Sequence, residues 1–336
     1  MIAQRFKKVG LSALRSVGAF SWAANSAWRS NRLLILCFHG ISLCDEHEWL
    51  PRLYITPDQL RRRMRILRSY DVSVLPLGEA VDRLRARSLP PRSVAITFDD
   101  GFHDFLSRAL PILQEFGYPS TLYLTTHYCG YRVPIFHLVT SYLLWKSRLQ
   151  VIDLTRFGVE KPALLRTFVE RQAAVDALRE WARQNRLDTM ARDMAARQLA
   201  DLVRIDYDDI LNNRLLQILT PDEVSTAARV GVDIQLHTHR HRTPRDRELF
   251  LREIRDNRNR IRTMTDREAT HFCYPSGDYA PEFLPWLREV GVQSATTCVL
   301  GLAGPASDPL LLPRVLDDST VGDIDFESWV CGIRAL

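Results

Sequence analysis

Short apolar runs alternate with amphipathic stretches over most of this chain. Each apolar run is long enough for a buried strand, and each amphipathic stretch repeats its apolar residues at the spacing of a helix face. The strand-like runs of the first part are residues 33–38, 72–75, 94–98 and 120–124. Helices are predicted after Thr56 and over 77–87 and 105–116. Such alternation is typical of an α/β fold with parallel strands.

The alternation stops near residue 130 and resumes at Thr220. Residues 163–204 show only helical spacing, with Val175, Leu178 and Trp181 on one face. We therefore predict a helical insertion over about 131–218, which either shapes ligand access or only stabilises the domain. Beyond it, strands are predicted at 232–236, 272–274, 293–299 and 310–316, and helices at 221–229, 247–264 and 281–290.

Residues 1–30 form a basic amphipathic segment. Its apolar stripe consists of Ile2, Phe6, Val9, Ala13, Val17 and Phe20, and the basic residues off the stripe are Arg5, Lys7, Lys8 and Arg15. Such a helix suits an anionic membrane surface, but a weak signal peptide or a helix packed on the domain fits the same pattern. We favour a packed or peripheral helix, because polar residues interrupt the apolar part. No run of about 18 apolar residues predicts a spanning helix.

The composition indicates a globular protein, because 336 residues of which 46% are hydrophobic can bury a full core. The net charge is +5, and only four of the 45 basic residues are lysine. This arginine excess fits either anionic ligands or the base composition of the genome, and we favour the second interpretation. No basic block with interleaved aromatic residues points to nucleic acid. Six cysteines without a CxxC pair favour a reducing compartment.

Two carboxylates and two histidines follow predicted strands. Asp99 and Asp100 come after the strand at 94–98, and His237 and His241 come after the strand at 232–236. The carboxyl ends of parallel strands share one rim, which is where α/β proteins bind ligands. Adjacent carboxylates repel each other unless a cation or a proton is shared. Two histidines and one carboxylate are a ligand set for zinc and other divalent ions, so the sequence predicts a metal site.

The motifs around these residues resemble those of a known family. Thr-Phe-Asp-Asp-Gly (97–101) and His-Thr-x-x-His (237–241) resemble the first two motifs of the NodB-homology polysaccharide deacetylases, which form carbohydrate esterase family 4. Phe-Cys-Tyr-Pro-Ser-Gly (272–277) has the position of the third motif. The resemblance implies a distorted (β/α)7 barrel, which we expect over residues 31–330, interrupted by the helical insertion.

The resemblance also implies a role for each matching residue. Asp99 corresponds to the catalytic base. Asp100, His237 and His241 correspond to the ligands of a divalent metal ion, for which we expect Zn2+. The backbone N–H of Ser276 corresponds to a donor for the oxyanion formed from the carbonyl.

Two positions depart from the family pattern. Cys273 replaces the arginine that orients the base, and Arg314 is a substitute, although a surface arginine is the interpretation we favour. The usual late histidine, the general acid, is also missing, because no histidine follows His271. Cys-Phe-His-Gly (37–40) resembles the pattern of the poly-N-acetylglucosamine de-N-acetylases, in which a histidine after the first strand takes that role. His39 is therefore either the general acid or a residue that caps the strand.

We conclude from the sequence that the protein is a metal-dependent hydrolase. The expected reaction removes an acetyl group, most simply an N-acetyl group, from a polysaccharide or a lipid-linked sugar in cell-envelope or exopolysaccharide biosynthesis. An amidohydrolase or deformylase of the same fold is the alternative. A non-catalytic carbohydrate-binding relic is disfavoured, because the metal ligands and the base are intact. We expect the protein in the cytoplasm or at the inner face of the membrane, contacted through residues 1–30, and export stays open.

Overall fold

Seven parallel strands form a closed barrel in the computed structural model, which describes residues 2–333. The strands follow the order β1-β12-β11-β10-β9-β6-β5, and β5 pairs with β1 to close the ring. They are β1 (Leu34–Phe38), β5 (Ser93–Phe98), β6 (Thr121–Leu124), β9 (Asp233–Leu236), β10 (His271–Cys273), β11 (Ser294–Leu300) and β12 (Leu312–Leu316). The predicted fold class, an α/β barrel of seven strands, is therefore confirmed.

The barrel is distorted beside β5. The strand β4 (Ser73–Val74) pairs with the start of β5, at Ser93 and Val94, whereas β6 pairs with its end, at Thr97 and Phe98. Both neighbours thus share one side of β5. A separate pair of short strands, β2 (Gly40–Ile41) and β3 (Tyr54–Ile55), continues from the end of β1.

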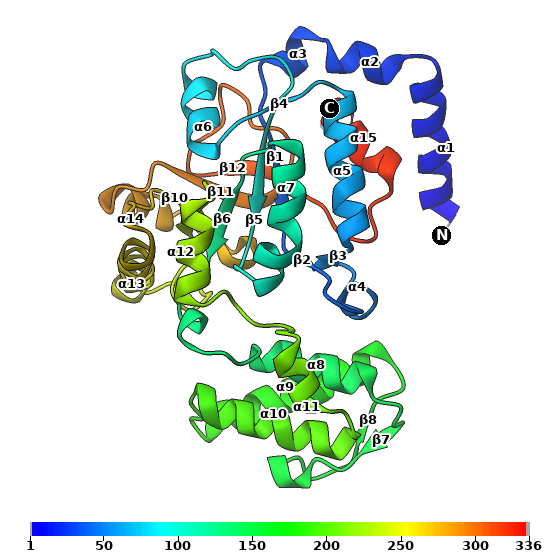
Figure 1. Ribbon diagram of the computed structural model, residues 1–336, viewed down its shortest axis with the longest axis vertical. Coiled ribbons are helices and arrows are strands. Elements are labelled where there is room, and N and C mark those ends of the chain that lie inside the picture. The colour runs from blue at the N-terminus through cyan, green and yellow to red at the C-terminus, as the bar shows by residue number, and fades with distance from the viewer. Residues whose placement is uncertain (1, 334–336) are drawn as a thin grey trace.

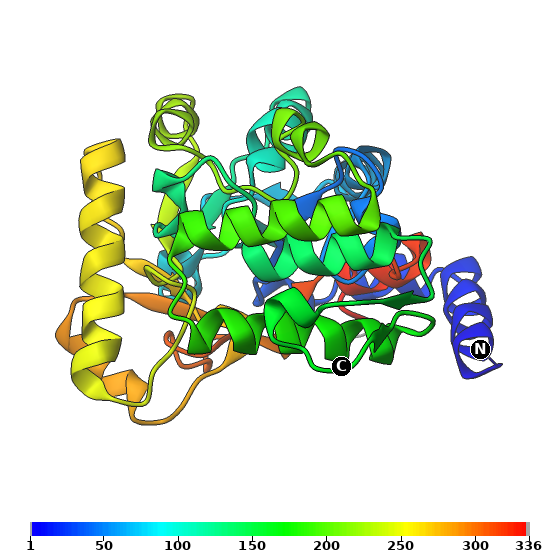
Figure 2. The ribbon, with the colours of Figure 1, turned by 90° about the horizontal axis from the view of Figure 1, so that it is seen from below.

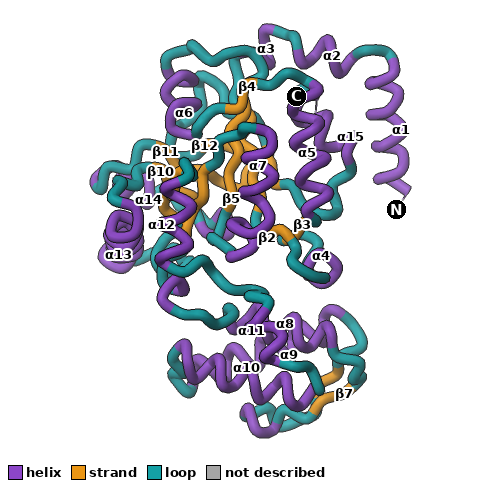
Figure 3. The backbone as a smooth tube through the Cα atoms, viewed as in Figure 1, coloured by secondary structure: helices purple, strands orange, loops and turns teal. Residues whose placement is uncertain are grey.

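Helices surround the barrel, as the tube in Figure 3 shows. They are α4 (Glu46–Trp49), α5 (Pro57–Ser69), α6 (Leu77–Arg85), α7 (Leu110–Phe116), α12 (Pro221–Arg229), α13 (Arg247–Thr265), α14 (Phe283–Glu289) and α15 (Asp323–Val330). Capping boxes start α5 and α12, where Thr56 and Thr220 each accept a backbone hydrogen bond from the third helical residue.

The helix predicted over 105–116 begins as a π-helix, Phe105–Ala109, before α7. Pro111 has no N–H to donate to the preceding turn, which explains the loosened start of this helix.

A helical segment lies between β6 and α12 and stands below the barrel in Figure 1. It contains α8 (Phe136–Lys146), α9 (Phe168–Gln184), α10 (Thr189–Val203) and α11 (Tyr207–Asn212). Val139, Val175 and Leu199 are buried in its core. A hairpin of β7 (Val151–Ile152) and β8 (Ala163–Leu164) also lies in this segment, and β8 takes the first two residues of the stretch 163–204, for which only helical spacing was predicted. Seen from below, the helices of this segment lie across the end of the barrel (Figure 2).

The N-terminal region forms α1 (Ile2–Ser16), α2 (Ala19–Ala24) and α3 (Ala27–Ser30), and Figure 1 shows α1 beside α15. Leu11 and Phe20 pack in a small cluster with Cys331 near the other end of the chain. The predicted stripe is not buried throughout, because the side chain of Val17 is 78% exposed. Over residues 2–333, no helix combines the length and apolar character needed to cross a membrane.

Candidate active site

The turn after β5 sends two neighbouring carboxylates in different directions. Asp100 has φ 70° and Gly101 has φ 88°, so the chain bends sharply after Asp99. A Cβ atom on residue 101 would lie 2.3 Å from the Cδ1 atom of Leu124, so only glycine fits there. The Asp99 side chain is buried, whereas Asp100 faces the histidines of the β9 end. The two acids are therefore not equivalent.

Asp100, His237 and His241 come together as a possible metal site, as the sequence predicted. The Oδ1 atom of Asp100 lies 3.3 Å from Nε2 of His237 and 3.2 Å from Nε2 of His241. The Nδ1 atom of His237 lies 2.9 Å from the carbonyl oxygen of Cys273. Since a carbonyl only accepts hydrogen bonds, Nδ1 carries the proton and Nε2 is free to ligate. This donor set fits a divalent ion and leaves coordination positions open for water and substrate.

Two other groups of side chains have metal-ligand spacing, Cys37 with His39 and Asp99, and Asp99 with His237 and Cys273. Both depend on Asp99, whose two oxygens already accept hydrogen bonds from a guanidinium. The group built on Asp100 therefore fits a metal ion best.

The partner of Asp99 is Arg314, which is fully buried in β12. Its two Nη atoms each donate to one oxygen of the carboxylate at 2.8 Å, and its Nε donates to the carbonyl of Thr297 at 3.0 Å. The expectation of a surface arginine is wrong. The guanidinium can be buried because its charge is paired and most of its donors are used. Arg314 thus holds the Asp99 carboxylate in place, as the arginine that Cys273 replaces would do.

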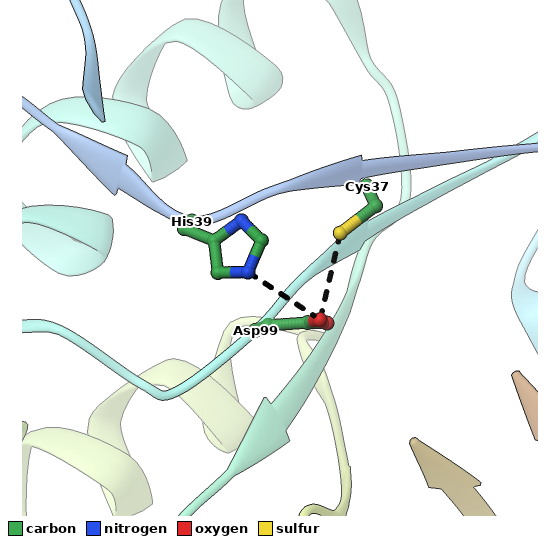
Figure 4. A group of neighbouring side chains, drawn as sticks. All are labelled: Cys37, His39 and Asp99. Atoms are coloured by element: carbon green, nitrogen blue, oxygen red, sulfur yellow. Dashed lines mark hydrogen bonds and ion pairs between the residues drawn. The ribbon is translucent and has the colours of Figure 1, made fainter. Parts of the chain in front are cut away.

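Two thiols complete the surroundings of Asp99. Cys273 and Cys37 lie 3.3 and 3.5 Å from its Oδ2 atom, and Figure 4 shows Cys37. Burial raises the pKa of both thiols, so they are protonated donors. Burial also tends to raise the pKa of Asp99, but the charge and hydrogen bonds of Arg314 outweigh it and hold that pKa below its usual range. Asp99 is therefore ionised at neutral pH.

His39 follows β1 directly and faces Asp99 in Figure 4. Its Nε2 atom lies 3.8 Å from Oδ2 of Asp99, and its side chain is 19% exposed. A protonated imidazole there would be attracted by the carboxylate and would still be reached by water. The geometry brings His39 to the base, and its role as general acid stays a prediction.

Ser276 lies in the 3-10 turn Pro275–Gly277 after β10 and lines the same cleft as Asp100 and His241. Its φ of 56° is unusual for a residue other than glycine. Asp100, Thr238 and His241 have positive φ angles as well. Strained backbone of this kind is concentrated at functional sites, where surrounding contacts maintain it.

Two buried polar residues of α13 support the histidine loop, and the sequence analysis missed both. The side-chain oxygen of Asn257 accepts from the N–H of His237 at 2.9 Å. The carboxylate of Glu253 accepts from the N–H of Arg240 at 2.7 Å and from Nε of Arg242 at 2.7 Å. The available signal was that both residues lie four apart on the apolar face of the helix, where polar side chains need partners.

A cleft of about 770 Å³ joins the site to the helical segment. Asp100, His241 and Ser276 line it from the barrel, and His137 and Arg192 line it from the helices α8 and α10. His39 is not among the described residues that line it. A ligand in this cleft would touch both parts of the molecule.

Comparisons with known proteins place the chain in a family. A polysaccharide deacetylase family model matches residues 86–295. A stretch of 101 residues is 28% identical to the poly-beta-1,6-N-acetyl-D-glucosamine N-deacetylase of Escherichia coli (strain K12) and covers 30% of this chain but 15% of that protein. A stretch of 90 residues is 28% identical to the protein of the same name from Staphylococcus epidermidis and covers 27% of this chain and 31% of the relative.

Solved structures show the same fold. The deacetylase PplD of Streptococcus pyogenes superimposes with a TM-score of 0.57 at 17% identity, covering 88% of this chain and 96% of that one. IcaB from Ammonifex degensii gives a TM-score of 0.56 at 15% identity, covering 90% and 98%. The resemblance noted in the sequence motifs is thus confirmed by a family match over more than half of the chain. The chain belongs to the polysaccharide deacetylase family.

Proposed function

We propose that the protein is a metal-dependent hydrolase that removes an N-acetyl group from a polysaccharide or a lipid-linked sugar. Family membership supports the reaction class, and the names of two relatives support an acetylated amino sugar. Those relatives are matched over less than a third of their own length, so the substrate comes from analogy. The observation that carries the proposal is the division of labour between Asp99, paired with Arg314, and Asp100, grouped with two histidines.

The catalytic residues act on water and on the scissile amide in turn. Asp100, His237 and His241 would hold a divalent ion, most simply Zn2+, which would supply a Lewis acid to acidify water and polarise the carbonyl. Asp99 takes a proton from the attacking water as the new C–O bond forms. Arg314 fixes both carboxylate oxygens, so the base is oriented before substrate binds.

The second half of the reaction needs a donor for the oxyanion and an acid for the leaving group. In the proposed mechanism, the backbone N–H of Ser276 donates to the oxyanion at the cleft surface. His39 then donates a proton to the amine nitrogen as the C–N bond breaks, so the products are acetate and a free amino sugar. At the end of the cycle Asp99 releases to solvent the proton that it took from water, and His39 regains from solvent the proton that it donated.

The proposed place of action is the cytoplasm, at the inner face of the membrane, in cell-envelope or exopolysaccharide biosynthesis. Leu11 and Phe20 pack on the barrel side, whereas the side chains of Val17 and Trp22 are 78% and 77% exposed. An exposed apolar pair on a segment with a basic sequence suits the surface of an anionic membrane. Sedimentation with anionic vesicles tests this, and equal binding of the full chain and its Trp22→Ser variant would contradict the contact.

Two measurements test the proposed reaction. Metal analysis of the purified protein is expected to find about one divalent ion per chain, and a chelator is expected to remove it together with activity. Acyl release is then measured over a panel of acetylated and formylated glycans and lipid-linked sugars. Acetate release supports the proposal, whereas formate release alone would establish the deformylase alternative. Protein that binds no metal and releases no acyl group would overturn the hydrolase and favour a carbohydrate-binding relic.

A further inference from the structure

The cleft over the site has a wall that the proposed mechanism does not use. Helices α9 and α10 contribute arginines to it, opposite the residues that the barrel supplies. The arginines that line the cleft are Arg179, Arg183, Arg192 and Arg240. Arginines that line a substrate cleft favour substrates with a negative charge, provided that acidic partners do not already neutralise the arginines.

Three of the four arginines have acidic partners within the protein. The Arg179 guanidinium lies 3.6 Å from Asp176, and that of Arg183 lies 2.5 Å from Glu180. Arg240 lies 3.1 Å from the buried carboxylate of Glu253. These pairs neutralise one another, and they explain why the wall as a whole is not strongly cationic.

Arg192 differs from the other three. No ion pair or hydrogen bond connects its side chain to the described part of the chain, residues 2–333, and its Nε atom is shielded from solvent without a partner. A guanidinium that lines a cleft without a counter-charge favours the binding of an anion there. Because Arg192 lines the cleft, the counter-charge that it lacks is expected from a molecule that enters the cleft.

The position of Arg192 connects it to the catalytic side of the cleft. Burial lowers the pKa of His137 to about 4, and the charges of Arg179, His241 and Arg192 add to that effect. His137 lines the cleft together with both arginines and His241. Its low pKa leaves it neutral at pH 7, so it adds no positive charge to that of the arginines. An anion beside Arg192 would be in the same cleft as the acyl group that Asp99 and Asp100 process.

We propose that Arg192 binds an anionic group of the substrate, a phosphate or a carboxylate attached to the acylated sugar. The inference deepens the proposed function and rests on it, because it specifies which acetylated sugars the site accepts. A guanidinium donates two parallel hydrogen bonds to either anion, so both chemistries fit Arg192. A neutral glycan offers hydroxyl and amide oxygens as acceptors but no negative charge to pair with Arg192.

Binding tests this independently of turnover. We compare N-acetylglucosamine, its 1-phosphate and the corresponding uronic acid by calorimetry with the metal-loaded full chain. At least one anionic sugar is expected to bind about tenfold more tightly than the neutral sugar, with an advantage that shrinks as salt is raised. Arg192→Gln is expected to abolish the advantage and leave neutral binding unchanged. Arg197→Gln is the control, because Arg197 lies on the same helix but pairs with Asp208 at 2.8 Å.

Turnover separates the possible sources of the anion. Sugars linked to a nucleotide diphosphate, to a polyprenyl pyrophosphate and to a plain phosphate are compared with a neutral oligomer. Arg192→Gln is expected to raise KM for the preferred anionic substrate about tenfold without changing kcat. Equal binding of neutral and anionic sugars, or an Arg192→Gln variant that keeps the preference, would overturn the inference while acetate release from neutral glycans upholds the reaction. Loss of all acyl release with anion binding intact would overturn the reaction alone.

Discussion

The ion pairs at the rim of the barrel are buried, whereas those on the wall of the cleft are exposed to solvent. At the rim, Asp99 and Arg314 come from strands far apart in the chain, are almost fully buried and satisfy each other. On the wall, the pairs of Asp176 with Arg179 and Glu180 with Arg183 are three residues apart on the exposed face of one helix. This difference teaches that a substitution in the buried pair of the barrel would cost much stability, so the catalytic groups are held in place. Substitutions of exposed charges on the helical segment would cost little stability, so the substrate preference can change there.

The sharpest way to break this comparison is to neutralise each rim carboxylate separately. Asp99→Asn is expected to lower kcat by about 10³-fold and leave the metal content unchanged, because the base is lost but no ligand is. Asp100→Asn is expected to lose the metal and activity together. Acetate release and metal analysis of both variants decide this. Equal metal loss in both would show that the two acids share the ion.

Replacing Arg314, the other member of the buried pair, is expected to lower the stability of the protein. Arg314→Met leaves the Asp99 carboxylate buried without its charge partner, which is expected to lower the free energy of unfolding by about 3–5 kcal/mol. Urea denaturation measures this. The double variant Arg314→Met with Asp99→Asn is expected to regain part of the loss, because no uncompensated charge stays buried. If the double variant is as unstable as the sum of the singles, the two side chains are not coupled.

Substitution of His39 is expected to lower kcat less than substitution of Asp99. His39→Gln is expected to lower kcat about 100-fold for amide substrates, whose amine must be protonated as it leaves. For a sugar ester with a good leaving group, kcat is expected to fall much less, because that leaving group departs without protonation by an acid. A comparison of the two substrate types thus distinguishes a general acid from a residue that only caps the strand, for which both rates would fall alike.

The ion pairs of Glu223, where the helical segment leads into α12, predict that the stability of the protein depends on pH. Glu223 lies in the first turn of α12 and pairs with Arg214 at 2.8 Å and with His103 at 3.2 Å. Burial works against ionisation, but the hydrogen bond from His103 and the backbone of Thr220 lower the pKa of Glu223 to about 2. Because this folded-state pKa lies below the unfolded value, the stabilisation is present above about pH 4.5 and is lost as the pH falls towards 2.

Glu223→Gln keeps the capping geometry and removes the charge. It is expected to be less stable than the wild type at pH 7, with a difference that shrinks below about pH 4.5 in urea titrations. Glu180→Gln is the control from the wall, since its carboxylate also pairs with an arginine but is open to solvent. We expect no measurable change from it at any pH. A constant difference for Glu223→Gln over the whole range would contradict the ionic origin of the effect.

The sequence alone determined the alternation of strands and helices and the positions where the acids and histidines follow their strands. Both depend on local patterns, the spacing of apolar residues and the residues at strand ends, which a linear chain displays. The same patterns predicted that Asp99 and Asp100 meet His237 and His241, because parallel strands bring their carboxyl ends to one rim. The family resemblance, not the pattern, singled out Asp100 as the ligand.

Only the tertiary structure decided how these groups are partnered. Arg314 lies 215 residues from Asp99 and is one of many arginines, so no local pattern distinguished it from a surface residue. The same holds for Asn257 behind His237 and for Arg192, whose significance is that it lacks a partner in the described chain. Partnership and burial depend on contacts between distant segments, which arise only when the barrel closes and the helical segment lies across its end.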